Sequence, residues 1–88
     1  MEQKEQESAN IDQTERLLND NWNERKHLVE QECDLRERTQ ALVLEGASRV
    51  AIDEARRKES ECRQALRKNC DEYEALITAW VAAMPSRT

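Results

Sequence analysis

The chain offers few of the side chains that carry out metal or covalent chemistry. Its 88 residues include three cysteines, Cys33, Cys62 and Cys70, and one histidine, His27. These residues show no CxxC or other zinc-ligand spacing, so we predict no metal site. With a single glycine there is no glycine-rich phosphate loop, and no Ser/His/Asp arrangement is evident. We therefore expect no catalytic residue, no cofactor and no enzyme activity.

The cysteines are expected to be reduced thiols. Their number is odd, no signal-peptide segment follows Met1, and no apolar run reaches the ~18–20 residues of a membrane span. These features favour a cytoplasmic protein without membrane contact, in which disulfides are rare. A bridge between Cys33 and Cys62 is an open alternative, because the two become neighbours if the chain folds back on itself.

Basic side chains on the second predicted helix form a candidate binding site. Arg49, Arg56 and Arg63 recur at every seventh position, and Arg67 falls on the same side of a helix. Such a stripe suits the phosphates of a nucleic acid or an acidic partner. However, acidic residues are intermingled with it, and no aromatic side chain interleaves for base stacking. A solvated flank paired with acids of the first helix is therefore the favoured interpretation, and nucleic acid is the less favoured partner.

Two predicted helices carry all these residues. The second helix has a row of positions that alternate by three and four residues, which is the spacing of a coiled coil. That row is Ile52, Ala55, Glu59, Cys62, Leu66, Asn69, Tyr73, Leu76 and Trp80. The matching row of the first helix is Ile11, Glu15, Leu18, Trp22, Arg25, Val29, Glu32, Arg36, Thr39 and Val43. We call the positions that face the other helix the seam.

One break separates the helices. Gly46 can adopt the left-handed conformation that ends a helix, and Ser48 can cap the next one. The seam also changes phase here, which favours a reversal over a straight rod. We predict an all-α, coiled-coil-like antiparallel hairpin as a single domain over residues 10–84. Its parts are a helix over 10–45, a turn at 46–48 and a helix over 49–84, between a polar segment 1–9 and a tail 85–88.

The reversal at residues 46–48 fixes which side chains meet. Apolar seam residues mostly face apolar ones, while Arg36 faces Glu59 and Arg25 comes near Asn69. These polar pairs are expected to fix the register at some cost in stability, as buried polar residues do in coiled coils. The alternative is that they form a polar site for a partner.

A further apolar row lies beside the seam of the first helix. It consists of Leu17, Leu28, Leu35 and Leu42, and alanines flank the seam of the second helix. A hairpin alone would leave this row exposed to solvent, and a chain of this size can bury only a small apolar core. We therefore predict that the leucine row is a partner or oligomer interface. Two hairpins would form a dimeric four-helix bundle, or one hairpin would join a larger helical hetero-complex.

Composition and charge limit the function classes. Charged and apolar residues each make up 38 % of the chain, and the net charge is −5. High charge with helical periodicity is typical of long amphipathic helices, and the acidic total disfavours nonspecific nucleic-acid binding. We expect a small protein–protein interaction module, an adaptor, scaffold or accessory subunit that self-associates or docks on partner helices. The alternatives are a small acidic inhibitor or chaperone of one larger target, and a nucleic-acid-binding bundle that uses the arginine stripe.

Overall fold

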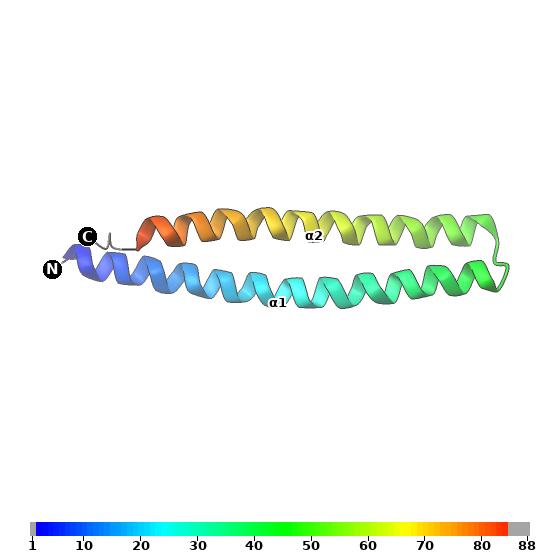
Figure 1. Cartoon of the computed structure of the whole chain (residues 1–88), viewed down its shortest axis with the longest axis horizontal. Helices are drawn as coiled ribbons and strands as arrows, with labels where there is room; N and C mark the ends of the chain where they lie inside the picture. Colours follow the sequence, from blue (N-terminus) through cyan, green and yellow to red (C-terminus); the bar gives the residue numbers. More distant parts are fainter. Residues whose placement is uncertain (1, 85–88) are drawn as a thin grey trace.

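Residues 2–9 and the first apolar row belong to one continuous helix. The structure, a computed structural model, describes residues 2–84, with side chains from residue 11 onward. Helix α1, Glu2–Leu44, packs antiparallel to helix α2, Arg49–Ala83 (Figure 1). The predicted all-α hairpin is thereby confirmed. Helix α1 begins at Glu2 rather than at residue 10, and the predicted tail 85–88 lies outside the described residues.

The turn is built as its sequence predicts. Gly46 has a φ of +71°, the left-handed conformation that ends α1. The backbone N–H of Ala47 donates to the carbonyl of Leu42 at 3.0 Å, which satisfies one of the last carbonyls of the helix. Ser48 then caps α2, because its hydroxyl accepts a hydrogen bond from the N–H of Ala51 at 3.2 Å. The two ends are therefore fixed locally, by three consecutive residues of the turn.

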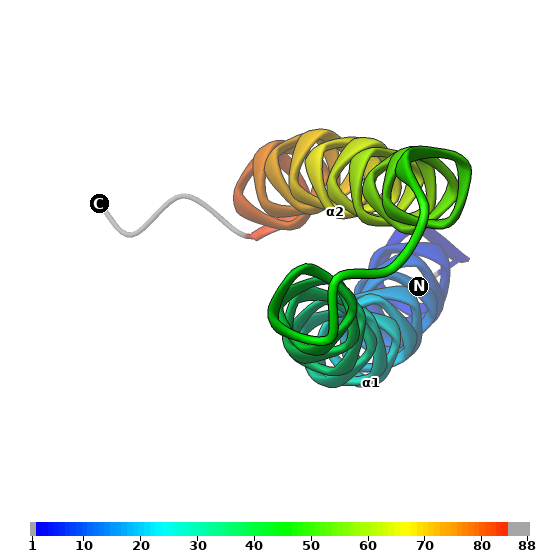
Figure 2. The same ribbon diagram turned by 90° about the vertical axis from the view of Figure 1, so that its right-hand side faces the viewer.

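The hairpin is long and thin. It measures 67 × 19 × 15 Å, and a view onto its turn shows the helices crossing over one another along their length (Figure 2). Such winding keeps a seven-residue seam facing the other helix over many turns. Two apolar residues of the described part are buried, Ala55 and Cys62. The buried polar residues of that part outnumber them: Asn21, Thr39, Glu59 and Asn69.

The seam of α1 differs from the predicted row by one residue at every second position. Its buried and half-buried positions are Ile11, Thr14, Leu18, Asn21, Arg25, Leu28, Glu32, Leu35, Thr39 and Leu42. Trp22, Val29 and Val43, which belong to the predicted seam, are exposed instead. On α2 the buried and half-buried positions include every residue of the predicted row except Tyr73.

Fit against α2 explains this rotation of α1. Asn21 lies opposite Asn69 and exchanges hydrogen bonds with its backbone, which the larger indole of Trp22 could not do in that space. Leu28 likewise faces the small side chain of Cys62, whose thiol lies 3.4 Å from the Leu28 carbonyl. The row that begins with Asn21 and continues with leucines therefore faces inward, and the row that begins with Trp22 faces outward.

Candidate interaction surfaces

Asn21 and Asn69 bind each other's backbone across the seam. The side-chain amide of Asn21 donates to the Asn69 carbonyl at 3.0 Å, and that of Asn69 donates to the Asn21 carbonyl at 3.1 Å. Arg25 completes the cluster by donating to the side-chain oxygens of Asn69 at 2.9 Å and Asn21 at 3.0 Å. Since these bonds satisfy the buried amides, the cluster is suited to fixing the register and leaves little for a ligand to bind.

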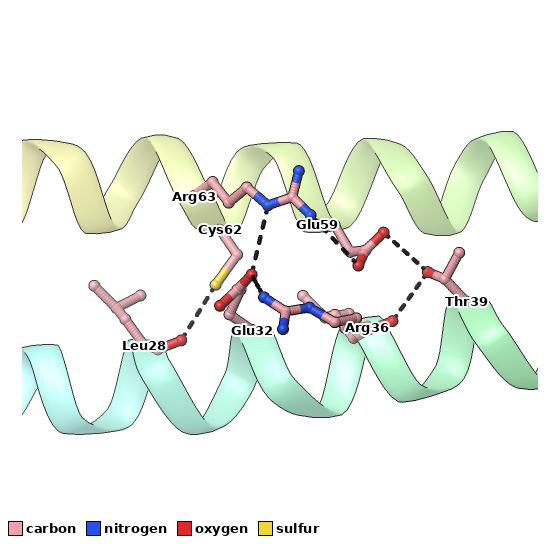
Figure 3. A network of polar contacts seen from close by, with 8 residues as sticks. Leu28, Glu32, Arg36, Thr39, Glu59, Cys62 and Arg63 are labelled. Carbon is pink, nitrogen blue, oxygen red and sulfur yellow. Dashed lines mark hydrogen bonds and ion pairs between the residues drawn. The ribbon is translucent and has the colours of Figure 1, made fainter.

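A second polar cluster lies nearer the turn (Figure 3). Glu32 of α1 accepts hydrogen bonds from Arg36 of its own helix at 2.6 Å and from Arg63 of α2 at 3.5 Å. The hydrogen bond from Arg36 is the main reason that the pKa of the Glu32 carboxyl is lowered; partial burial opposes it, and the charges of both arginines assist it. Glu32 therefore holds one arginine from each helix.

The predicted pairing of Arg36 with Glu59 does not occur. Glu59 is buried, lies 3.2 Å from the hydroxyl of Thr39, and has Arg63 of its own helix 3.8 Å away. The rotation of α1 is the cause, because Thr39 takes the inner position opposite Glu59 while Arg36 lies at the flank and folds back onto Glu32 (Figure 3). That hydrogen bond also raises the pKa of the Arg36 guanidinium.

The predicted interface row of leucines lies largely against α2. Leu28, Leu35 and Leu42 are half-buried and line shallow grooves beside alanines of that helix. Leu17 is 46 % exposed and is the member that the hairpin covers least. We call the side defined by these four leucines the leucine face. Because the hairpin itself uses most of this row, less of it is left for a partner than the sequence suggests.

The other flank of α1 also exposes apolar side chains. Trp22, Val29 and Val43 are 52 %, 45 % and 49 % exposed, and Arg36 fills the gap in their seven-residue spacing. Residues at this spacing stay on one side of a coiled coil, so the stripe runs for roughly 32 Å, about half the length of the hairpin. We call the side defined by the following residues the tryptophan face: Trp22, Val29, Arg36 and Val43 of α1 with Arg49, Arg56 and Arg63 of α2.

A groove opens on the tryptophan face near the turn. It has a volume of about 400 Å³ and is lined by Arg36, Gln40 and Val43 of α1 and by Arg56 of α2. The buried carboxylate of Glu59 also borders it. The groove thus combines apolar walls with guanidinium groups, a combination that accepts flat aromatic side chains.

Among the side chains that the structure describes, two of the four arginines of the predicted stripe lie close to acidic groups, and the other two do not. Arg63 lies 3.5 Å from Glu32, and Arg49 lies 3.9 Å from an aspartate one turn later in α2. Arg56 and Arg67 have no ion-pair partner within residues 11–84. Seven-residue spacing keeps Arg49, Arg56 and Arg63 on the tryptophan face, whereas Arg67 follows one turn after Arg63 and lies farther round the helix.

The cysteines and the histidine stay apart. In the described part of the chain, no group of His, Cys, Asp and Glu side chains is placed to hold a metal ion. Cys33 and Cys70 are exposed and Cys62 is buried, and all three are free thiols. Burial, followed by the nearby charge of Glu32, raises the pKa of the Cys62 thiol. His27 is exposed.

Sequence reasoning missed the tryptophan face and the inward position of Asn21. Both follow from one choice between two adjacent apolar rows on α1, and apolar content alone does not separate them. The usable signal is Asn21 itself, because the turn at Gly46 brings it to the level of Asn69. A buried amide needs a partner, and only the rotated seam supplies one.

Comparison with known proteins does not indicate a function for this chain. The sequence matches no family model, and comparisons with curated proteins and with solved structures give no significant match. Neither of the described helices combines the length and the apolar content needed to span a bilayer. The two faces of the hairpin are therefore judged on their own exposure, shape and charge.

Proposed function

We propose that this chain is a small helical interaction module, an adaptor, scaffold or accessory subunit that acts by binding rather than by catalysis. Its tryptophan face packs against other helices. The supporting observation is the exposure of Trp22, Val29 and Val43 at positions that share one heptad row. A row of this kind is a helix-packing surface, and covering it contributes up to about 1.5–3 kcal/mol for each fully buried side chain.

The total surface of the chain supports the same proposal. The hairpin exposes 7359 Å² of surface. A compact folded monomer of this length exposes roughly 5,400 Å² by the usual scaling with mass. The excess of roughly 2,000 Å² is more than the ~800 Å² that each partner of a standard protein–protein interface buries. The molecule therefore has the surface of a protein that completes its core with a partner.

The charges on the tryptophan face favour a protein partner over a nucleic acid. Arg63 and Arg49 already lie close to acidic side chains, so they have less charge to offer to phosphates. A face that exposes both an aromatic ring and arginines is instead typical of protein interfaces, where a guanidinium group can stack on an aromatic ring of the partner. An inhibitor or chaperone that docks on one larger target would use the same face and the same contacts.

The test replaces the exposed row and leaves the seam intact. The variant Trp22→Gln/Val29→Thr/Val43→Thr removes the apolar stripe, and the control Leu17→Gln/Val50→Thr removes exposed apolar groups elsewhere. Light scattering across concentrations measures self-association, and capture from the native cell measures retention of a protein partner. We expect the wild type and the control to associate in at least one assay and the triple variant to fail. Equal behaviour of all three proteins, with equal helical content by circular dichroism, would contradict the proposal.

A further inference from the structure

We infer that the partner of the tryptophan face is a second copy of this chain, with its turn at the opposite end. In this pairing Trp22 of each copy enters the groove between Val43 and Arg56 of the other, and the two hairpins form a four-helix bundle. The inference rests on the proposed function, because it names the occupant of the face described there.

The positions of Trp22 and the groove along the hairpin support this geometry. The groove is level with Thr39, and it lies as far beyond Glu30 as Trp22 lies before it, within one residue. A two-fold axis that lies in the interface, crosses the helices and passes near Glu30 therefore exchanges the two levels. The same rotation brings Val43 over Leu18 of the second copy, so apolar groups meet at both ends.

The groove suits an indole ring in size and chemistry. Its volume is about 400 Å³, and Val43 and the side-chain stems of Arg36 and Gln40 supply apolar walls. The Arg56 guanidinium has no ion-pair partner within residues 11–84 and is free to stack on the ring. Rings of this chain already attract cations, since the Arg25 guanidinium carbon lies 4.7 Å from the centre of the Tyr73 ring.

Charge selects the opposite-end arrangement over the same-end one. If both turns lay at one end, Arg36, Arg49 and Arg56 of the two copies would gather there and repel one another. With the turns at opposite ends, Arg56 comes to the level of Trp22 and Tyr73 of the second copy. Arg49 then comes to the level of Glu15. Arg49 and Arg56 therefore each meet a carboxylate or an aromatic ring, which the same-end arrangement does not offer them. Arg36 comes to the level of Arg25, and Arg63 stays near the axis.

The overlap of the two copies in this pairing has the area of a stable dimer interface. The stretch from Glu15 to the turn is roughly 46 Å long at the helical rise of 1.5 Å per residue. The hairpin is 19 Å wide. Full overlap would cover roughly 900 Å² of each copy, which is close to the ~800 Å² per partner of a standard interface.

The first test compares one truncation on each face of the full-length chain. Trp22→Ala is expected to raise the dimer dissociation constant at least about 30-fold in sedimentation experiments, as for a central hot-spot residue. Leu17→Ala, which trims a similarly exposed side chain on the leucine face, is expected to change it less than about threefold. Circular dichroism of both variants checks that the helices are retained. The reverse order of effects would overturn the inference, because it would place the interface on the leucine face.

The second test measures the orientation of the copies. A spin label is attached to Val50→Cys, an exposed site next to the turn, in a chain that also carries Cys33→Ser, Cys62→Ala and Cys70→Ser. Opposite-end pairing predicts a distance between labels of roughly 45 Å along the bundle. A distance below about 30 Å, as set by helices ~8–10 Å apart, would show same-end pairing and overturn the inference.

A third outcome separates the inference from the proposed function. If the wild type stays monomeric at every concentration, the second copy is excluded as the partner. The proposed function then still stands, provided that the wild type retains a different protein and the Trp22→Gln/Val29→Thr/Val43→Thr variant does not.

Discussion

Asn69 is the most deeply buried side chain of the described part, at 1 % exposure, and it is polar. A lone asparagine in a coiled-coil seam usually costs stability and fixes register. Here its amide donates to Asn21 and its side-chain oxygen accepts from Arg25, so the cost of burying it is offset within the cluster. At the scale of single residues, satisfied polar groups therefore specify how the two helices align.

Removal of this amide should destabilise the hairpin. We expect Asn69→Ala to lower the free energy of unfolding by about 1–3 kcal/mol, because it removes the side-chain donor to the Asn21 carbonyl and the side-chain acceptor of the Arg25 hydrogen bond. Asn23→Ala, at an exposed position of α1, should stay within about 0.5 kcal/mol of the wild type. Urea unfolding measures both. A loss for Asn69→Ala no larger than that for Asn23→Ala would contradict this account.

The Glu32 carboxylate should make stability depend on pH. Its pKa is lowered in the folded chain, chiefly by the hydrogen bond from Arg36, so the ionised form stabilises the fold. That stabilisation is complete above the unfolded pKa of glutamate, about 4.3, and disappears as the pH falls through the lowered pKa. Urea midpoints of the wild type should therefore exceed those of Glu32→Gln near neutral pH and approach them in acid. A difference that stays constant into acid would contradict this account.

The three thiols should differ in reactivity. Burial raises the pKa of Cys62, and the thiolate is the nucleophile, so Cys62 should react with a thiol reagent more slowly than Cys33 and Cys70. Mass spectrometry after timed alkylation at neutral pH gives the three rates. In denaturant the rates should converge. Equally fast labelling of Cys62 in the native state would mean that the helices separate there.

At the scale of elements, the turn decides how the two helices meet. Gly46 ends α1 in the left-handed conformation and Ser48 begins α2, so the reversal needs no support from distant residues. The alignment of the seam follows from the position of this reversal. The insertion or deletion of one residue in the turn would shift the pairing of every layer of the seam.

Replacement of Gly46 measures the free-energy cost of the left-handed backbone conformation at this position for a residue other than glycine. A Cβ added at Gly46 would meet no atom within 4 Å, so Gly46→Ala introduces no clash. Its φ of +71° is nevertheless unfavourable for alanine, and we expect a loss of about 1–2 kcal/mol in unfolding free energy. Gly46→Asn should lose less, because asparagine tolerates this conformation. Thermal and urea unfolding would show the order, and an alanine variant as stable as the wild type would contradict it.

The sequence predicts the hairpin and its turn because both rest on local signals. Glycine, a capping serine and heptad spacing each act within a few residues. The side of α1 that faces α2 is harder to predict, because Trp22, Val29 and Val43 form one apolar row and the leucines form another beside it. The choice depends on what lies opposite in α2, namely Asn69 and small side chains, and that is a tertiary property. The two rows alone therefore do not show that Leu28, Leu35 and Leu42 pack against α2 while Trp22, Val29 and Val43 are exposed.

At the scale of the whole molecule, the hairpin lacks a closed apolar core. Within the described residues only Ala55 and Cys62 are buried apolar groups, while large apolar side chains such as Trp22 remain exposed. Two helices packed only on each other cannot bury more apolar surface, because each contacts the other along a narrow seam. A second layer of helices on the tryptophan face removes this deficit, which is why we place the function of the chain in association.

The emission of Trp22 tests the central claim most directly. In the variant Trp80→Phe, Trp22 is the remaining indole of the chain. We predict that its emission maximum lies at short wavelength in concentrated solution and moves to longer wavelength on dilution, over the same range in which the sedimenting mass falls by half. An emission maximum typical of a solvated indole at all concentrations, alongside an unchanged dimer mass, would contradict the claim that a second copy covers the tryptophan face.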